Sequence, residues 1–197
     1  MLTILTLKIL LMIVYLSHWD WNLYKSRIDI VSSLEDKNIV AMCPQGEYTD
    51  KLKGTYKQII DWNINREKIL DKRGLKNLID NLKKLDEGTI VHSFTIRTGI
   101  LYSIANIFVE NKITGVLSIN GLGYLFSNNL KAKILKVIIK LFIKRLFNTS
   151  FNKIIFQNTN DKETLIKFLK YKGESILIPG SGIKMDNFIK KDDYSNK

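Results

Sequence analysis

The chain has 197 residues, a formal net charge of +12 and a hydrophobic content of 45%. This length fits one domain with a full hydrophobic core, and the apolar content with only two prolines excludes a disordered chain. The charge does not indicate a nucleic-acid reader, because most of it is lysine spread along the chain, whereas bidentate contacts to phosphate and guanine use arginine.

The N-terminal residues and the single cysteine set two further limits. The apolar stretch 1–16 contains a lysine and is shorter than the roughly 20 residues that span a bilayer, and no small-residue cleavage site follows it. We interpret Lys8–Leu16 as the first buried strand and Met1–Leu7 as an extension, with a membrane-dipping N-terminus as the alternative. Cys43 lies in an apolar run and has no disulfide partner, so we expect a buried, unreactive thiol in a reducing compartment.

Beyond this strand, apolar runs rich in Ile, Val and Leu alternate with segments of helical periodicity. In chain order we expect a helix at Asn22–Lys37, strands at Asn38–Cys43 and Thr55–Trp62, a helix at Gly74–Asp86, a strand at Thr89–His92, a helix at Thr98–Glu110, a strand at Ile113–Ile119, a helix at Asn129–Phe147, a strand at Lys153–Gln157, a helix at Asp161–Tyr171 and a strand at Ser175–Pro179. This alternation predicts an α/β fold, a Rossmann-like doubly wound parallel sheet with helices on both faces.

Two histidines are candidates for a catalytic or ligand-binding role. His92 ends its predicted strand, where an imidazole can act as a general base or hydrogen-bond donor; a half-buried histidine with satisfied hydrogen bonds is the equal alternative. His18 follows the first strand, and we slightly favour an ordinary loop residue there. Neither has a partner at metal-ligand spacing, and no Walker loop, nucleophile elbow or dinucleotide fingerprint is present.

Two glycine-rich turns follow predicted strands. Gly121-Leu122-Gly123-Tyr124 comes after Ile113–Ile119, at the kind of strand end where open α/β sheets bind ligands. Pro179-Gly180-Ser181-Gly182 follows the last strand, and its backbone amides suit an anionic group; a plain chain reversal is the alternative.

The segment Leu130–Phe147 is dense in lysine. Four lysines recur at helical spacing, beside apolar positions that exceed the needs of one core face, and these are Lys133, Lys136, Lys140 and Lys144. A basic amphipathic helix suits an anionic membrane surface, whereas a core-packed helix with a solvated lysine face is the more frequent outcome.

Taken together, these segments resemble the N-terminal, acceptor-side domain of family 4 glycosyltransferases, the retaining GT-B enzymes. The branch it resembles builds bacterial cell-surface polysaccharides, such as lipopolysaccharide or capsule, and lipid-linked oligosaccharides. The segments that carry the resemblance are Trp21–Arg27, Arg73–Leu75, Val91–Arg97, Ile119–Tyr124, Ile155–Asn158 and Ile178–Ile183. The chain departs from the family mildly at Arg97-Thr98, where Lys-Pro is usual, and at Asn120, where Thr is common.

The resemblance implies transfer of a glycosyl group from a nucleotide-sugar to a lipid-linked or polysaccharide acceptor, with retained configuration and without a metal or other cofactor. It implies His92 as the catalytic residue. It also implies a set of substrate-binding residues within the same segments: Trp21, Asn22, Thr95, Arg97, Asn120, Gly121, Gly123, Gln157, Asn158, Gly180, Ser181 and Gly182. Lys133, Lys136, Lys140 and Lys144 would face the inner surface of the cytoplasmic membrane.

The domain organisation that follows is a single transferase half. We expect residues 1–189 to form the N-terminal domain and residues 190–197 a polar tail or the start of a linker. The C-terminal donor-binding domain is absent from this sequence, so we expect a partner chain to supply it or the half alone to be inactive or weak. A non-enzymatic module of the same fold that binds a membrane or an anionic polymer is the alternative function.

Overall fold

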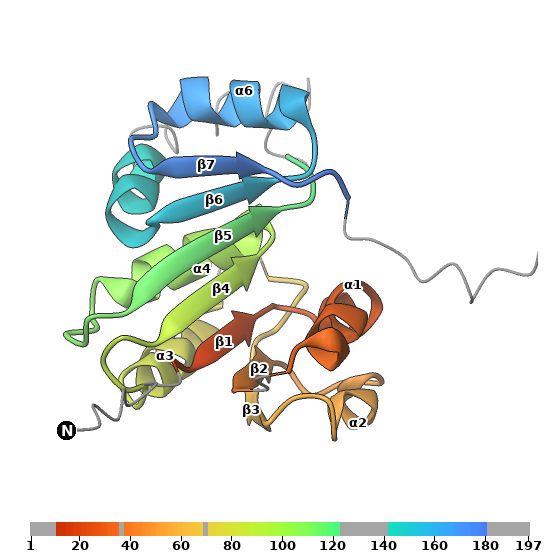
Figure 1. Cartoon of the computed structure of the whole chain (residues 1–197). Coiled ribbons are helices and arrows are strands. Elements are labelled where there is room, and N and C mark those ends of the chain that lie inside the picture. The colour runs from red at the N-terminus through yellow and green to blue at the C-terminus, as the bar shows by residue number, and fades with distance from the viewer. Residues whose placement is uncertain (1–10, 36–37, 69–70, 123–141, 181–197) are drawn as a thin grey trace, which may run out of the picture.

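Residues 11–35, 38–68, 71–122 and 142–180 are described by the structure, a computed structural model. Their strands form one all-parallel sheet in the order β3-β2-β1-β4-β5-β6-β7 (Figure 1). The strands are β1 (Ile13–Leu16), β2 (Ile39–Cys43), β3 (Gln58–Asp61), β4 (Ile90–Phe94), β5 (Thr114–Ile119), β6 (Lys153–Phe156) and β7 (Glu174–Leu177). The sequence prediction of a Rossmann-like doubly wound sheet is therefore confirmed.

Helices cover the two faces of this sheet unequally. On one face lie α1 (Asp20–Ser33) and the short α2 (Thr49–Leu52), which pack on β1, β2 and β3. The other face carries α3 (Lys72–Leu82), α4 (Ile96–Asn106), the helical residues 142–150 and α6 (Thr159–Leu169). In the view of Figure 1 no helix of the described residues lies in front of β4–β7, on the side of the sheet that carries α1.

Side-chain alternation along the strands divides the core into two clusters. In β1, Val14 and Leu16 belong to the larger cluster beneath α3, α4 and α6, whereas Tyr15 belongs to the smaller cluster beneath α1. Cys43 lies at the end of β2 in the smaller cluster and is fully buried, as predicted. Burial, with Asp20 nearby, raises the pKa of its thiol to about 12, so the thiolate does not form at neutral pH.

Several predicted boundaries are corrected. The helix predicted from Asn22 begins at Asp20, and the strand predicted to end at His92 continues to Phe94. The four-residue helix α2 was missed, because Thr49–Leu52 is too short to show helical periodicity. Residues 1–10, most of the predicted helix Asn129–Phe147 and the tail 190–197 lie outside the described residues.

No helix in the described part of the chain is both long and apolar enough to cross a membrane.

Candidate functional site

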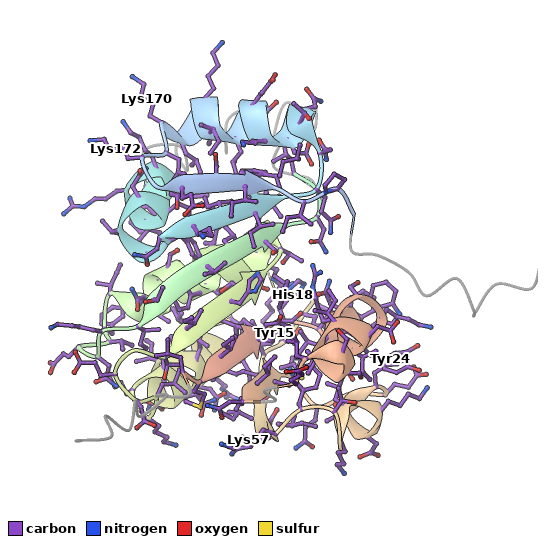
Figure 2. All side chains as sticks on the ribbon, viewed as in Figure 1. Tyr15, His18, Tyr24, Lys57, Lys170 and Lys172 are labelled. Atoms are coloured by element: carbon purple, nitrogen blue, oxygen red, sulfur yellow. The ribbon has the colours of Figure 1, made fainter. Side chains whose placement is uncertain are left out.

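The strand order places a topological switch point between the carboxyl ends of β1 and β4, here called the crevice. From β1 the chain turns to α1 on one face of the sheet, and from β4 it turns to α4 on the other face. Ligands of open α/β sheets bind at such a topological switch point. His18 follows β1 and Thr95 follows β4, so both lie at this position, and Figure 2 shows His18 near the end of β1.

His18 makes a polar cluster with two threonines across the crevice. Its ring Nδ1 lies 2.8 Å from Thr98 Oγ1 and 3.4 Å from Thr95 Oγ1, and its backbone N–H donates to Thr98 Oγ1 at 3.3 Å. Burial lowers the pKa of His18 to about 4, and the positive charges of Arg97 and Arg66 act in the same direction. At neutral pH the imidazole is therefore uncharged and can donate or accept a hydrogen bond.

Thr95 adopts a strained backbone conformation, with φ of +78° and ψ of 152°. A β-branched residue rarely occupies this region, and the conformation costs roughly 1–3 kcal/mol. Neighbouring hydrogen bonds hold it there: its N–H donates to the Ser118 carbonyl at 2.9 Å, and its carbonyl accepts from Gly99 at 3.0 Å. Stored strain of this kind gathers at binding and catalytic sites.

Arg97, predicted to bind substrate, holds a loop in this structure. Its guanidinium donates to the backbone carbonyls of Asn65, at 3.2 Å, and of Arg66 and Lys68. The carboxylate of Asp71 fixes the same loop by accepting from the Asn65 N–H at 2.9 Å, and this hydrogen bond lowers the pKa of Asp71. Arg97 therefore positions the loop that carries Arg66.

Beside the crevice lies a pocket of about 350 Å³, here called the tryptophan pocket. Its walls come from α1, from the turn after β2 and from the loop held by Arg97; its lining residues include Trp19, Trp21, Gln45, Glu47 and Arg66. Trp21 thus lines a pocket, and its predicted substrate-binding role stays a prediction. Asn22, its neighbour, is buried and lines neither this pocket nor the cavity described next.

A second space of about 300 Å³, here called the sheet cavity, is lined by residues of α1 and of the strands β1, β4, β5 and β6. Three of the predicted site residues line it, namely His92, Gln157 and Gly180, together with Tyr15 and Arg27. Its walls are mainly apolar, with Phe94, Ile155 and Ile178 among them.

Within this cavity His92 lies inside β4 and not at its end, which corrects the position predicted from sequence. Its Nε2 lies 2.7 Å from Ser118 Oγ, and its ring packs 5.3 Å from Tyr15 and 4.4 Å from Phe94. Burial lowers its pKa to about 3, helped by the charge of Arg27. Such an imidazole accepts a proton poorly at neutral pH, so the geometry favours a packing and hydrogen-bonding role over general-base catalysis.

Arg27 was not singled out from the sequence although it lies in a segment of the resemblance. It reaches from α1 toward the sheet and is only 8% exposed. Its guanidinium lies 4.5 Å from the Phe94 ring centroid, and Nη2 donates to Asn120 Oδ1 at 3.4 Å. Asn120, predicted to bind substrate, contacts this buried arginine and is itself exposed, so its binding role stays a prediction.

The remaining predicted site residues divide by position. Asn158 caps α6: its Oδ1 accepts from the Asp161 N–H at 2.8 Å, so this oxygen serves the helix end. Around Gly121 the described atoms leave open space for a Cβ, and Gly180 has φ of +72°. Lys144 lies half-buried among the helical residues 142–150. The others lie outside the described residues, and they are Gly123, Ser181, Gly182, Lys133, Lys136 and Lys140.

The fold and the crevice define a Rossmann-like α/β protein with polar side chains gathered at the carboxyl edge of a parallel sheet. Compared with known proteins, the chain matches no family model and no curated protein. In the described part of the chain, no group of three or more histidine, cysteine, aspartate or glutamate residues is placed to hold a metal ion.

Proposed function

We propose that the chain is the acceptor-side domain of a retaining glycosyltransferase that acts in cell-surface glycan synthesis. One observation carries the proposal. Five of the six segments of the resemblance contribute residues that follow the carboxyl ends of five parallel strands, along one edge of the sheet, whereas the sixth, Arg73–Leu75, lies in α3. The residues at this edge are Trp21 after β1, Thr95 after β4, Asn120 after β5, Gln157 after β6 and Gly180 after β7.

The chemistry of this edge suits a sugar acceptor. The uncharged imidazole of His18 and the hydroxyl of Thr95 are both partly exposed and can exchange hydrogen bonds with the hydroxyl groups of a sugar, while the fully buried Thr98 holds the imidazole in place. We therefore assign the acceptor contact to His18, which lies at the switch point, in place of the half-buried His92 inside β4. A nucleotide-sugar bound by a second GT-B domain, on a continuation of this chain or on a separate one, would supply the glycosyl group.

Peripheral contact with the inner face of the cytoplasmic membrane is part of the same proposal. A lipid-linked acceptor requires it, and Phe142, 58% exposed, stands two residues from Lys144 at the described end of the basic segment. Flotation with vesicles of anionic phospholipid tests it. Loss of flotation on reversing the charges of Lys133, Lys136, Lys140 and Lys144 would support the contact, and unchanged flotation would exclude it.

The transferase proposal is tested by assaying the chain together with its donor-binding domain. Membrane glycolipid and a panel of nucleotide-sugars are supplied, and labelled sugar transfer is measured. His18→Asn keeps a polar atom near the Nδ1 position and removes Nε2, so we expect it to lower kcat. Ser32→Ala, a change at an exposed serine on α1, is the control. Absence of transfer from every nucleotide-sugar by the complete protein would refute the function.

A further inference from the structure

The tryptophan pocket has an unusual aromatic wall at the surface. Trp19 and Trp21 stack with ring centroids 4.8 Å apart and an interplanar angle of 22°. The guanidinium of Arg66 lies 4.9 Å from the Trp19 centroid. Trp19 is nevertheless 38% exposed, and its side chain makes no capping hydrogen bond for α1. A large aromatic side chain left at the surface beside a pocket is typical of a contact surface for a ligand.

One wall of this pocket is held by a buried carboxylate. Asp20 is 3% exposed and accepts hydrogen bonds from the backbone N–H groups of Trp21, at 2.9 Å, and Tyr48, at 2.8 Å, and from Thr49 Oγ1, at 3.3 Å. The turn approaches Asp20 so closely that a Cβ on Gly46 would lie 2.7 Å from Asp20 Oδ2. The turn that carries Gln45 and Glu47 is thus fixed against the start of α1.

The opposite wall is held by Arg97 and Asp71, which fix the loop that carries Arg66. Charged side chains therefore fix both loops around the tryptophans. Arg97 and Asp71 do not line the pocket, and Asp20, which does, already accepts hydrogen bonds from the turn after β2. A pocket whose walls are fixed before a ligand arrives loses less entropy on binding.

We propose that the tryptophan pocket binds a pyranose ring, one sugar unit of the acceptor. This proposal rests on the transferase function above. Because Trp21 and Arg66 already contact the Trp19 ring, the C–H face of the sugar would pack on the exposed part of this stacked pair. Gln45 and Glu47 with Arg66 would provide hydrogen-bond donors and acceptors for its hydroxyl groups. Glu47 and Arg66 bring opposite charges to the pocket, which suits a polyhydroxylated ring better than a phosphate.

Saturation-transfer NMR of the full chain with methyl glycosides of glucose, galactose and N-acetylglucosamine tests the proposal. We expect saturation on the C–H protons of one ring face. Trp19→Ala should weaken binding about fivefold. Phe108→Ala is the matched control, because it removes an aromatic ring that is 54% exposed and lines neither described pocket. Arg66→Ala, with Arg73→Ala as its control, gives the same comparison if Trp19→Ala does not fold.

The proposal is overturned if no glycoside receives saturation from the wild-type chain, if the pocket variants bind as well as their controls, or if uridine binds in place of the glycosides. The transferase function can fail separately. Glycoside binding without transfer by the complete protein would leave a sugar-binding module. Transfer that Trp19→Ala and Arg66→Ala do not weaken would keep the enzyme and place its acceptor elsewhere.

Discussion

The environment of His92 makes the stability of the protein depend on pH, and replacing it with glutamine tests this. Glutamine can still reach Ser118 Oγ from this position in β4 but does not titrate. The prediction concerns the pH dependence of the free energy of unfolding, so any constant cost of the substitution cancels.

The magnitude follows from the pKa of the imidazole in the two states. Burial lowers it from 6.5 in the unfolded chain to about 3 in the folded protein. Between these values the unfolded chain binds a proton that the folded protein does not. Proton binding by the unfolded chain therefore lowers the free energy of unfolding as the pH falls below 6.5, whereas above pH 6.5 His92 causes no such loss. At about 1.4 kcal/mol per pH unit, going from pH 7 to pH 5 costs about 2 kcal/mol through this residue.

Urea unfolding at pH 7 and pH 5 measures the effect in the wild type and in His92→Gln. We expect the variant to lose about 2 kcal/mol less than the wild type over this interval. Equal losses in the two proteins would mean that His92 titrates like an exposed histidine and would refute its placement among Tyr15, Phe94 and Arg27. His18→Asn should likewise lose about 2 kcal/mol less unfolding free energy than the wild type between pH 7 and pH 5, because the pKa of His18, about 4, also lies below this interval.

Two further predictions concern the backbone. Gly115→Ala should lower the free energy of unfolding by about 2–4 kcal/mol in urea, because its Cβ would collide with the Ser150 carbonyl oxygen. Gly121→Ala, with open space at the Cβ, should change the free energy of unfolding by less than about 0.5 kcal/mol. Equal changes in the two variants would contradict the close approach of Gly115 to Ser150. Thr95→Gly and Thr95→Ala both remove the hydroxyl that caps α4, so both should lower sugar transfer, but only glycine relieves the positive φ. We expect the glycine variant to have a free energy of unfolding about 1 kcal/mol higher than the alanine variant, and equal values would show that no strain is stored.

The sheet could be predicted from the sequence because its strands are short apolar runs. The sequence predicts a strand at Asn38–Cys43, and the structure has one at Ile39–Cys43. The agreement is close because a strand buried on both faces is a continuous apolar run, which is easy to recognise. The error at β4 has a physical cause. Ser93 and Phe94 look like the start of a polar loop, but both are fully buried, and only the packing of β4 between β1 and β5 shows this.

The site was less predictable, because its contacts join distant parts of the chain. His18 and Thr98 are 80 residues apart, and no local pattern announces that they meet. An arginine on a helix is expected at the surface, yet the Arg27 guanidinium packs over the Phe94 ring. Its place in the segment Trp21–Arg27 was the one available signal. The capping role of Asn158 could have been recognised, because an asparagine three residues before Asp161 is typical of a helix start.

The position of β1 in the sheet has a consequence for how the molecule forms. Ile13 of β1 pairs with Ile39 of β2 on one side and with Ile90 of β4 on the other. The pairing of β1 is therefore complete only after β4, from the middle of the chain, has been synthesised. On a ribosome, β1, β2 and β3 emerge well before β4 and can assemble only one side of the crevice. Long-range parallel pairing of this kind is slow. Until β4 emerges, the edge of β1 that later pairs with it stays unpaired in the nascent chain, and wrong strand pairing can begin there.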